Sequence, residues 1–197
     1  MQLAKHIAQG KLTYLSQGTE EISVSENKHY RWLAFGRNNE EQVIQSIMLK
    51  RKPWKLTLPH QTALMLPLMF FKPKSVVELG LGCGNIQRFI TNLSTQITIH
   101  SIEHHNVVID CFNKYFNPLE NQVHVIYNDS QEWLKRNNIN YDWYICDIYQ
   151  QDIQRYSNTV RQWETLTSHG NPNTHLTINL PKTNKNEPKW ILHKLTK

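Results

Sequence analysis

Residues 76–85, VVELGLGCGN, place a short apolar run, an acid and a glycine turn next to one another. The run ends at Glu78, and glycines follow at every second position as Gly80, Gly82 and Gly84. Glycine permits positive φ angles and lets a ligand approach the backbone closely, which suits a turn between a strand and a helix. The stretch therefore predicts a ligand site at the end of a buried strand, with a purely structural turn as the alternative.

Apolar runs and helical patterns alternate along the chain from residue 75 onward. The predicted strands are residues 75–79, 97–103, 123–127, 141–147 and 175–180, and the predicted helices are residues 85–93, 106–116, 131–136 and 151–166. Strands that alternate with helices predict an α/β fold, in which a parallel sheet is covered by helices on both faces and joined by right-handed crossovers.

A different pattern precedes this region. Residues 21–49 mix β-formers with turn residues, and Asn27-Lys28 can turn residues 22–25 into residues 30–35, which predicts a small antiparallel unit. Pro59 suits the first position of a helix, which we expect to run to about residue 71 with a kink at Pro67. We therefore divide the chain into a small β-rich unit, residues 1–56, and a Rossmann-like domain, residues 57–197.

Acids stand at the ends of the next three strands of the predicted sheet. Glu103 comes 21 residues after Gly82, where a carboxylate can accept hydrogen bonds from both ribose hydroxyls of a nucleoside. Asp129 can bond an exocyclic adenine amine, cap the following helix, or do both. Asp147 ends the fourth strand, so all these acids meet at one edge of the sheet, where open α/β folds bind ligands.

The order of these acids resembles class I S-adenosylmethionine-dependent proteins, and Glu78 at the head of the turn favours them over NAD dehydrogenases. A closer resemblance, to the spermidine synthase family, extends over residues 32–180. It is carried by residues 60–68 (HQTALMLPL), the glycine turn, Glu103, Asp129 and the 141–147 strand, with Phe35-Gly36, Gln45-Ser46 and Ile178-Asn179-Leu180 in support. The resemblance implies a methyltransferase-type, mostly parallel sheet preceded by a small β-unit.

The resemblance also implies an activity, the transfer of an aminopropyl or related group from decarboxylated S-adenosylmethionine, or from S-adenosylmethionine itself, to a small amine. Asp147 would be the catalytic base, because the attacking amine must lose a proton. The nucleoside site would comprise Glu78, Gly80, Gly82, Cys83, Gly84, Glu103, Asp129 and Ser130, and the acceptor site Gln45, His60, Gln61 and Gln150. The resemblance further implies a homodimer.

Three positions depart from the pattern of the family. Gln150 stands where the family has a second acid, His60 where it has a tyrosine, and Cys83 where it has an aspartate in the glycine turn. A neutral Cys83 would not repel the carboxylate of S-adenosylmethionine, so we expect weak discrimination between the two nucleosides; alternatively, Cys83 only fills space behind the turn. These departures leave open a methyltransferase and a non-catalytic nucleoside-binding relative.

Composition excludes several other classes. The 197 residues carry a formal net charge of +6, and no aromatic pattern accompanies the basic residues 50–52, so we do not expect a nucleic-acid partner. The three cysteines form no CxxC pair, which fits a reduced cytoplasm and gives no sign of a metal site. No apolar run is long enough to cross a membrane, and the first residues do not resemble a signal peptide.

Overall fold

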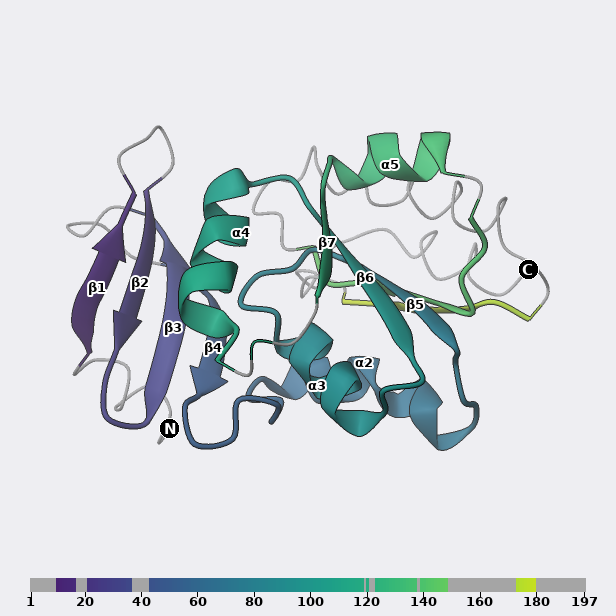
Figure 1. The fold of residues 1–197 in the computed structure, drawn as a ribbon, viewed down its shortest axis with the longest axis horizontal. Coiled ribbons are helices and arrows are strands. Elements are labelled where there is room, and N and C mark those ends of the chain that lie inside the picture. The colour runs from purple at the N-terminus through teal and green to yellow at the C-terminus, as the bar shows by residue number, and fades with distance from the viewer. Residues whose placement is uncertain are drawn as a thin grey trace, which may run out of the picture.

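The structure, a computed structural model, describes residues 10–16, 21–36, 43–118, 120, 123–137, 139–148 and 173–179. Within these residues the chain forms a four-stranded antiparallel sheet followed by a five-stranded parallel sheet with helices around it (Figure 1). This is the α/β architecture with a preceding β-unit that the sequence predicts.

The antiparallel sheet contains β1 (Lys11–Leu15), β2 (Ile22–Glu26), β3 (Tyr30–Phe35) and β4 (Val43–Leu49), paired in that order. Asn27 makes the turn between β2 and β3, because its Oδ1 accepts the N–H groups of His29 and Tyr30, both at 2.8 Å. The predicted antiparallel unit is thus confirmed. Strand β1 was not predicted, because it lies before the segment in which the sequence showed alternation.

The parallel sheet contains β5 (Ser75–Leu79), β6 (Thr98–Glu103), β7 (His124–Tyr127), β8 (Trp143–Cys146) and β9 (His175–Ile178). Its order is β7-β6-β5-β8-β9, and every neighbouring pair is parallel. The five predicted strands are confirmed with small shifts at their ends. The predicted helix at residues 151–166 lies outside the described residues.

The described helices are α2 (Pro59–Leu64), η1 (Leu66–Met69), α3 (Asn85–Leu93), α4 (Asn106–Cys111), η2 (Phe112–Phe116) and α5 (Ser130–Arg136). The single helix expected from Pro59 to residue 71 is wrong: α2 ends at Leu64 and η1 is a 3₁₀-helix. Pro67 has no N–H to donate and its ring obstructs the preceding turn, so the α-helix cannot continue through it. The predicted helix at 106–116 is α-helical only in its first part, and η2 has π-helical pairing.

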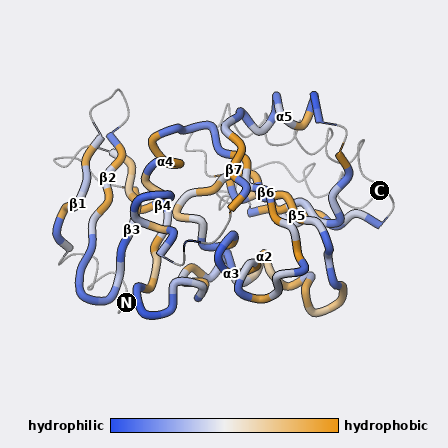
Figure 2. Tube along the Cα trace, in the orientation of Figure 1, coloured by the Kyte–Doolittle hydropathy of each residue, from blue (hydrophilic) through white to orange (hydrophobic). Residues whose placement is uncertain are grey.

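Helices cover both faces of the parallel sheet because successive side chains on its strands point to opposite faces (Figure 1). Val77 and Leu79 of β5 pack with Trp133 and Leu134 of α5. On the other face, Val76 packs in a cluster that contains residues of α2 and α3. Figure 2 shows the hydrophobic residues along β5, β6 and β7, and hydrophilic ones at the turn between β2 and β3.

A third hydrophobic cluster joins the two sheets. Ile22, Val24, Leu33 and Met48 of the antiparallel sheet pack with residues of the glycine turn, α4 and η2, and α4 lies between the sheets (Figure 1). The boundary expected between residues 56 and 57 falls in the connection between β4 and α2. The shared cluster fixes the antiparallel sheet against the glycine turn, which brings β4 next to the site described below.

Candidate functional site

The glycine turn connects β5 to α3 with all three glycines in the positive-φ region: 93° at Gly80, 52° at Gly82 and 67° at Gly84. Gly80 N–H donates to Ile102 O at the end of β6, at 2.9 Å. On the other side, a Cβ at Gly80 would lie 3.0 Å from the carbonyl oxygen of Asp147, which follows β8. The turn is therefore held between the ends of the two neighbouring strands, and Gly80 is required for that close fit.

Gly84 is explained by packing. A Cβ there would lie only 2.2 Å from Cε2 of Phe112, which is completely buried in the cluster between the sheets. Gly82 is different, because its nearest neighbour would be Cβ of Ser46 in β4, at an ordinary 3.5 Å. Of these glycines, only Gly82, which is partly exposed, would accept a Cβ without displacing a neighbour.

Glu103 anchors the turn from β6. Its Oε2 accepts the N–H of Leu81 at 3.1 Å, and its Oε1 accepts the N–H groups of His104 and His105, both at 2.9 Å. Burial acts to raise the pKa of this carboxyl, but the hydrogen bonds from His104, His105 and Leu81 outweigh it and hold the pKa below its ordinary value. Glu103 is thus a charged, preorganised acceptor beside the turn, where the sequence places the ribose.

Glu78 lies deeper, under the turn. Ser101 Oγ is 2.7 Å from both Glu78 Oε2 and Gln87 Oε1. The hydroxyl of Ser101 is the donor to these two oxygens, and its single proton serves one of them at a time. Burial, with the nearby charges of Asp147 and Glu103, raises the pKa of Glu78 well above its ordinary value, although the hydrogen bond from Ser101 opposes the shift. Burial therefore favours the neutral form of Glu78, which packs beneath the turn.

Asp129 caps the N-terminus of α5, which is one of the two roles expected for it. Its Oδ1 accepts the N–H groups of Gln131 and Glu132 at 2.9 and 3.0 Å. The adenine contact expected of Asp129 and Ser130 stays a prediction. Both residues follow β7, so the structure brings them to the same edge of the sheet as Glu103, which ends β6.

Asp147 and His60 come from distant parts of the chain and meet at this edge. Nε2 of His60 lies 3.6 Å from Oδ1 of Asp147, and the same oxygen accepts a 2.8 Å hydrogen bond from Nδ2 of Asn179. Sequence analysis assigned a role only to the first two residues. The neighbouring Asn179, just after β9, stood only within the family resemblance and had no role assigned to it.

A contact with the tail of the nucleoside would require Cys83 to face the edge of the sheet, and it does not. Its side chain is completely buried in the cluster between the sheets, together with Leu33, Phe112 and Phe116. Burial raises the pKa of its thiol to about 12, so the group is neutral. The placement corrects the nucleoside-contact interpretation and matches the alternative, in which Cys83 fills space behind the turn. The sequence does not show which way a residue between two glycines points.

Gln61, expected at the acceptor, is buried in a polar network instead. Its Oε1 accepts from Nδ2 of Asn85 at 3.1 Å, and Nδ2 of Asn85 also donates to Ile47 O at 2.8 Å. Gln61 therefore connects α2 to α3 and β4. Gln45 is the extra residue where the pairing of β3 and β4 is irregular, because Leu33 pairs with Ser46 and Ala34 with Ile44. Gln150 lies outside the described residues.

Arg88 of α3 was missed by sequence analysis. It is completely buried, and its guanidinium donates to the carbonyl oxygens of Pro53, Cys83 and Phe116 and to Oδ1 of Asn85. Burial lowers the pKa of Arg88 to about 10, which leaves it charged at neutral pH. The residue ties the glycine turn to η2 and to the loop after β4, a role that a single arginine in a helix pattern does not reveal.

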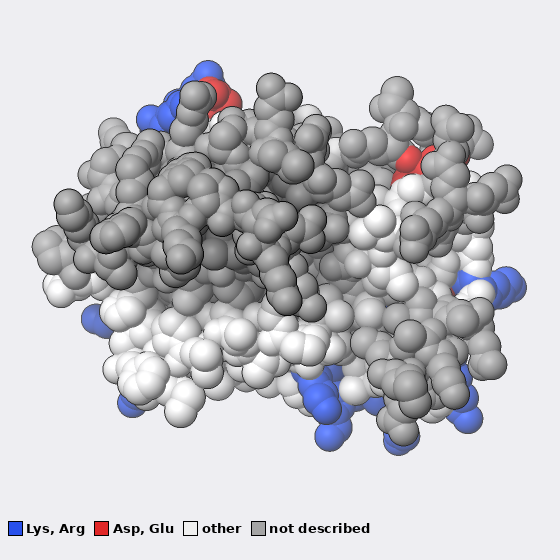
Figure 3. All heavy atoms as spheres, turned by 180° about the vertical axis from the view of Figure 1, so that it is seen from behind, with Lys and Arg blue, Asp and Glu red and all other residues white. Residues whose placement is uncertain are grey.

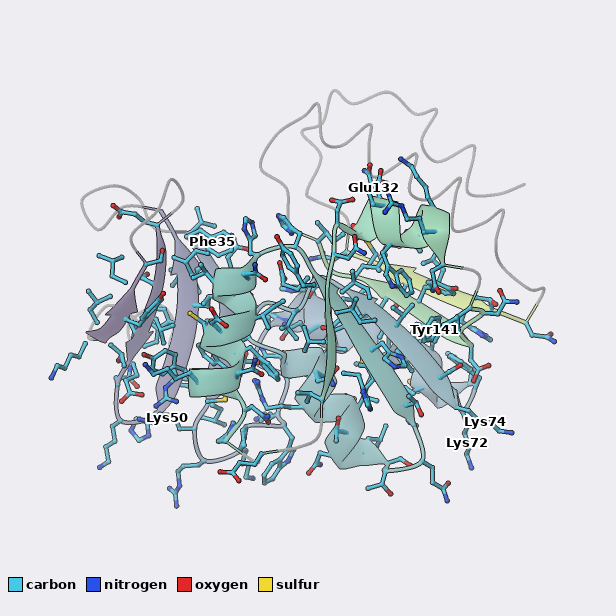
Figure 4. The ribbon with its side chains drawn as sticks, turned by 45° about the horizontal axis from the view of Figure 1, so that its top comes forward. Phe35, Lys50, Lys72, Lys74, Glu132 and Tyr141 are labelled. Atoms are coloured by element: carbon cyan, nitrogen blue, oxygen red, sulfur yellow. The ribbon has the colours of Figure 1, made fainter. Side chains whose placement is uncertain are left out.

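Further along this edge, Phe35 ends β3 and lies beside the start of α4 (Figure 4). Its ring contacts that of His105 in an edge-on arrangement, with centroids 5.8 Å apart.

The described Lys and Arg side chains stand at separate places around the face in Figure 3 and not in one patch. Among the described residues no cluster of three or more His, Cys, Asp or Glu is placed to hold a metal ion. Within the same part of the chain no helix is long and apolar enough to span a bilayer.

No protein-family model and no curated protein matches the sequence. Solved structures do match. A probable spermidine synthase from Corynebacterium glutamicum aligns with a TM-score of 0.57 and 13% identity over 73% of this chain and 54% of its own. Spermidine synthase in complex with the transition-state analogue AdoDATO aligns with a TM-score of 0.52 and 16% identity, over 71% of this chain and 47% of its own. Human methyltransferase-like protein 13 in complex with SAH aligns with a TM-score of 0.50 and 14% identity, over 60% of this chain and 63% of its own.

The chain spans about half the length of the spermidine synthases that it resembles. At these identities the comparisons establish the fold. The expectation drawn from the sequence is confirmed at that level: the chain has the Rossmann-like fold that spermidine synthases share with S-adenosylmethionine-dependent methyltransferases, preceded by a small antiparallel sheet.

Proposed function

We propose that the protein is a transferase that binds a sulfonium nucleoside, S-adenosylmethionine or its decarboxylated form, and transfers an alkyl group from it to a small acceptor. One observation carries the proposal. The turn with three positive-φ glycines is held between Glu103 at the end of β6 and Asp147 after β8, at one edge of a parallel sheet. Open α/β sheets bind ligands at this edge, where the strand order reverses.

The residues present fit such a donor. Glu103 offers a charged carboxylate that backbone amides already orient, and the partly exposed Gly82 has no side chain to keep a ligand from the backbone. Asp147, 14% exposed at its side chain, supplies negative charge beside the donor site, where a cationic sulfonium and a nucleophile would meet. We assign the acceptor to the side of Asp147 that His60 lines.

We propose aminopropyl transfer to an amine as the first candidate reaction, supported by the likeness to spermidine synthases and by the position of Asp147. Methyl transfer is the second candidate, because the neutral, buried Cys83 provides no carboxylate in the turn to reject S-adenosylmethionine. We propose a homodimer on the resemblance alone, which light scattering tests.

Calorimetric titration with S-adenosylmethionine, decarboxylated S-adenosylmethionine and methylthioadenosine tests the donor site. Incubation of each donor with a panel of amines then separates the reactions by their products. Aminopropyl transfer releases methylthioadenosine, whereas methyl transfer releases S-adenosylhomocysteine. Binding without either product would leave a non-catalytic nucleoside-binding protein, and no binding of any of the three compounds would end the proposal.

A further inference from the structure

The side chains of His60, Asp147 and Asn179 form a set of polar groups beside the glycine turn. Asn179 donates to Oδ1 of Asp147 at 2.8 Å, and Nε2 of His60 stands 3.6 Å from the same oxygen. The side chain of His60 is 39% exposed and that of Asp147 only 14%. Of the two groups, the imidazole is therefore the one that an incoming acceptor meets first.

The backbone fixes all three residues. His60 follows Pro59 in the first turn of α2, and the next residue, Gln61, is buried and bonded to Asn85 of α3. The N–H of Asp147 donates to Leu79 O at 3.0 Å, and that of Asn179 donates to Cys146 O at 2.9 Å. The ring of His60 can adjust its separation from Asp147 through its own side-chain torsions, while the carboxylate stays in place.

The orientation of the His60 ring gives its two nitrogens different roles. With Nε2 toward the carboxylate, the neutral tautomer that carries its proton on Nε2 is the one that Asp147 stabilises. Nδ1 is then left with its lone pair, away from Asp147. An imidazole oriented by a carboxylate through one nitrogen accepts a proton at the other, which is the arrangement of a general base with a positioning partner.

We propose that His60 is the group that takes the proton from the acceptor, and that Asp147, held by Asn179, positions the imidazole and stabilises its charged form. This inference rests on the proposed transferase function and adds a residue to it. It also gives a chemical meaning to a histidine where the spermidine synthase pattern has a tyrosine.

The lone pair of the acceptor nitrogen attacks the carbon next to the sulfonium, and the carbon–sulfur bond breaks with its electron pair going to sulfur, which becomes a neutral thioether. The proton of the acceptor N–H passes to Nδ1 of His60. The positive charge of the sulfonium thus ends on the imidazolium, which faces the carboxylate of Asp147, and no metal or redox partner takes part.

The test uses the full chain and whichever donor and amine give turnover in the wild type. His60→Ala is expected to lower kcat by about 10²–10⁴-fold, with the affinity for methylthioadenosine unchanged. Millimolar imidazole should restore a substantial part of the lost rate, because the vacated space admits a free base. His60→Gln keeps the size of the side chain, so it should lose the same rate and gain nothing from imidazole. His29→Ala, an exposed histidine at the β2–β3 turn, is the matched control and should retain full turnover.

Asp147→Asn and Asn179→Ala test the positioning partners. Both should lower kcat, and neither should respond to imidazole, since the natural imidazole is still present. Circular dichroism and the affinity for methylthioadenosine show whether each variant is folded.

Full turnover in His60→Ala, or a loss that imidazole does not restore, would overturn the role of His60 while the transferase function stands. If the wild type binds methylthioadenosine yet releases neither product with any amine, the transferase function itself fails, and the role of His60 fails with it.

Discussion

The carboxylate of Glu103 accepts the backbone N–H of Leu81 at 3.1 Å, so the end of β6 holds the turn that follows β5. The same side chain also accepts the N–H groups of His104 and His105. A residue chosen from the sequence for its place beside a ribose thus has a structural task as well. Its substitution is expected to affect both ligand binding and folding.

Glu103→Ala should weaken binding of methylthioadenosine by about 1.5–3 kcal/mol, the range for hydrogen bonds to a charged group. It should also lower the free energy of unfolding, because the buried N–H of Leu81 and the part-buried N–H groups of His104 and His105 lose their acceptor. Calorimetry and urea unfolding measure the two effects. Glu132→Ala, an exposed acid on α5, is the control, and the same affinity in both variants would rule out a ribose contact by Glu103.

The pH dependence of stability gives a separate test of Glu103. Its pKa in the folded protein is lowered, so its contribution to stability is present above the unfolded value and is lost as pH falls through the folded value. Wild type should therefore be more stable than Glu103→Gln at neutral pH, and the difference should shrink as the pH falls below about 4. A difference that stays constant over this range would show that the carboxylate charge does not stabilise the turn.

Glu78 is expected to show the opposite sign. Its pKa is raised in the folded protein, so its neutral form contributes fully below the ordinary value of 4.5, and stability is lost as pH rises toward the folded value. Glu78→Gln stays neutral and its amide oxygen can still accept the hydroxyl of Ser101, so it should be at least as stable as wild type at about pH 8. Urea unfolding of both proteins between about pH 5 and pH 8 measures this. A variant that is much less stable at every pH would contradict a neutral Glu78.

Gly84 and Gly82 form a matched pair, because both have positive φ but differ in the space beside them. Gly84→Ala would drive a methyl group into the ring of Phe112 and should cost about 1–3 kcal/mol of stability beyond the strain of the backbone. Gly82→Ala should cost only the strain, about 1–2 kcal/mol, yet should reduce nucleoside affinity. Equal losses of stability in both variants would show that Phe112 moves aside without cost.

Cys83→Asp would place a carboxylate in the cluster between the two sheets. We expect destabilisation by several kcal/mol or a failure to fold, because a buried charge without a partner is costly. Cys83→Ala, which only removes the sulfur atom, should be milder. Thermal unfolding compares the two, and a stable Cys83→Asp with altered donor preference would restore the interpretation in which residue 83 faces the nucleoside.

Sequence patterns determined the strands of the parallel sheet and most of the helices between them, in their order. The strand at 75–79 and the helix at 85–93 have the predicted bounds, because the apolar run and the glycines act within a few residues of each other. Glu103 was found at the end of its strand for the same reason. Parallel pairing then brings strand ends to a common edge, so the approximate place of the candidate site also followed from the sequence.

Only the tertiary structure decided how residues distant in the chain face one another. The meeting of His60 with Asp147 and Asn179 depends on how α2 packs with β8 and on how β9 pairs with β8, and the burial of Cys83 depends on the antiparallel sheet that packs behind the turn. Gly84 is required by Phe112, and Arg88 by carbonyl groups of three separate segments. The periodicity of a single segment carries no information about such contacts, because they arise from the packing of whole elements against each other.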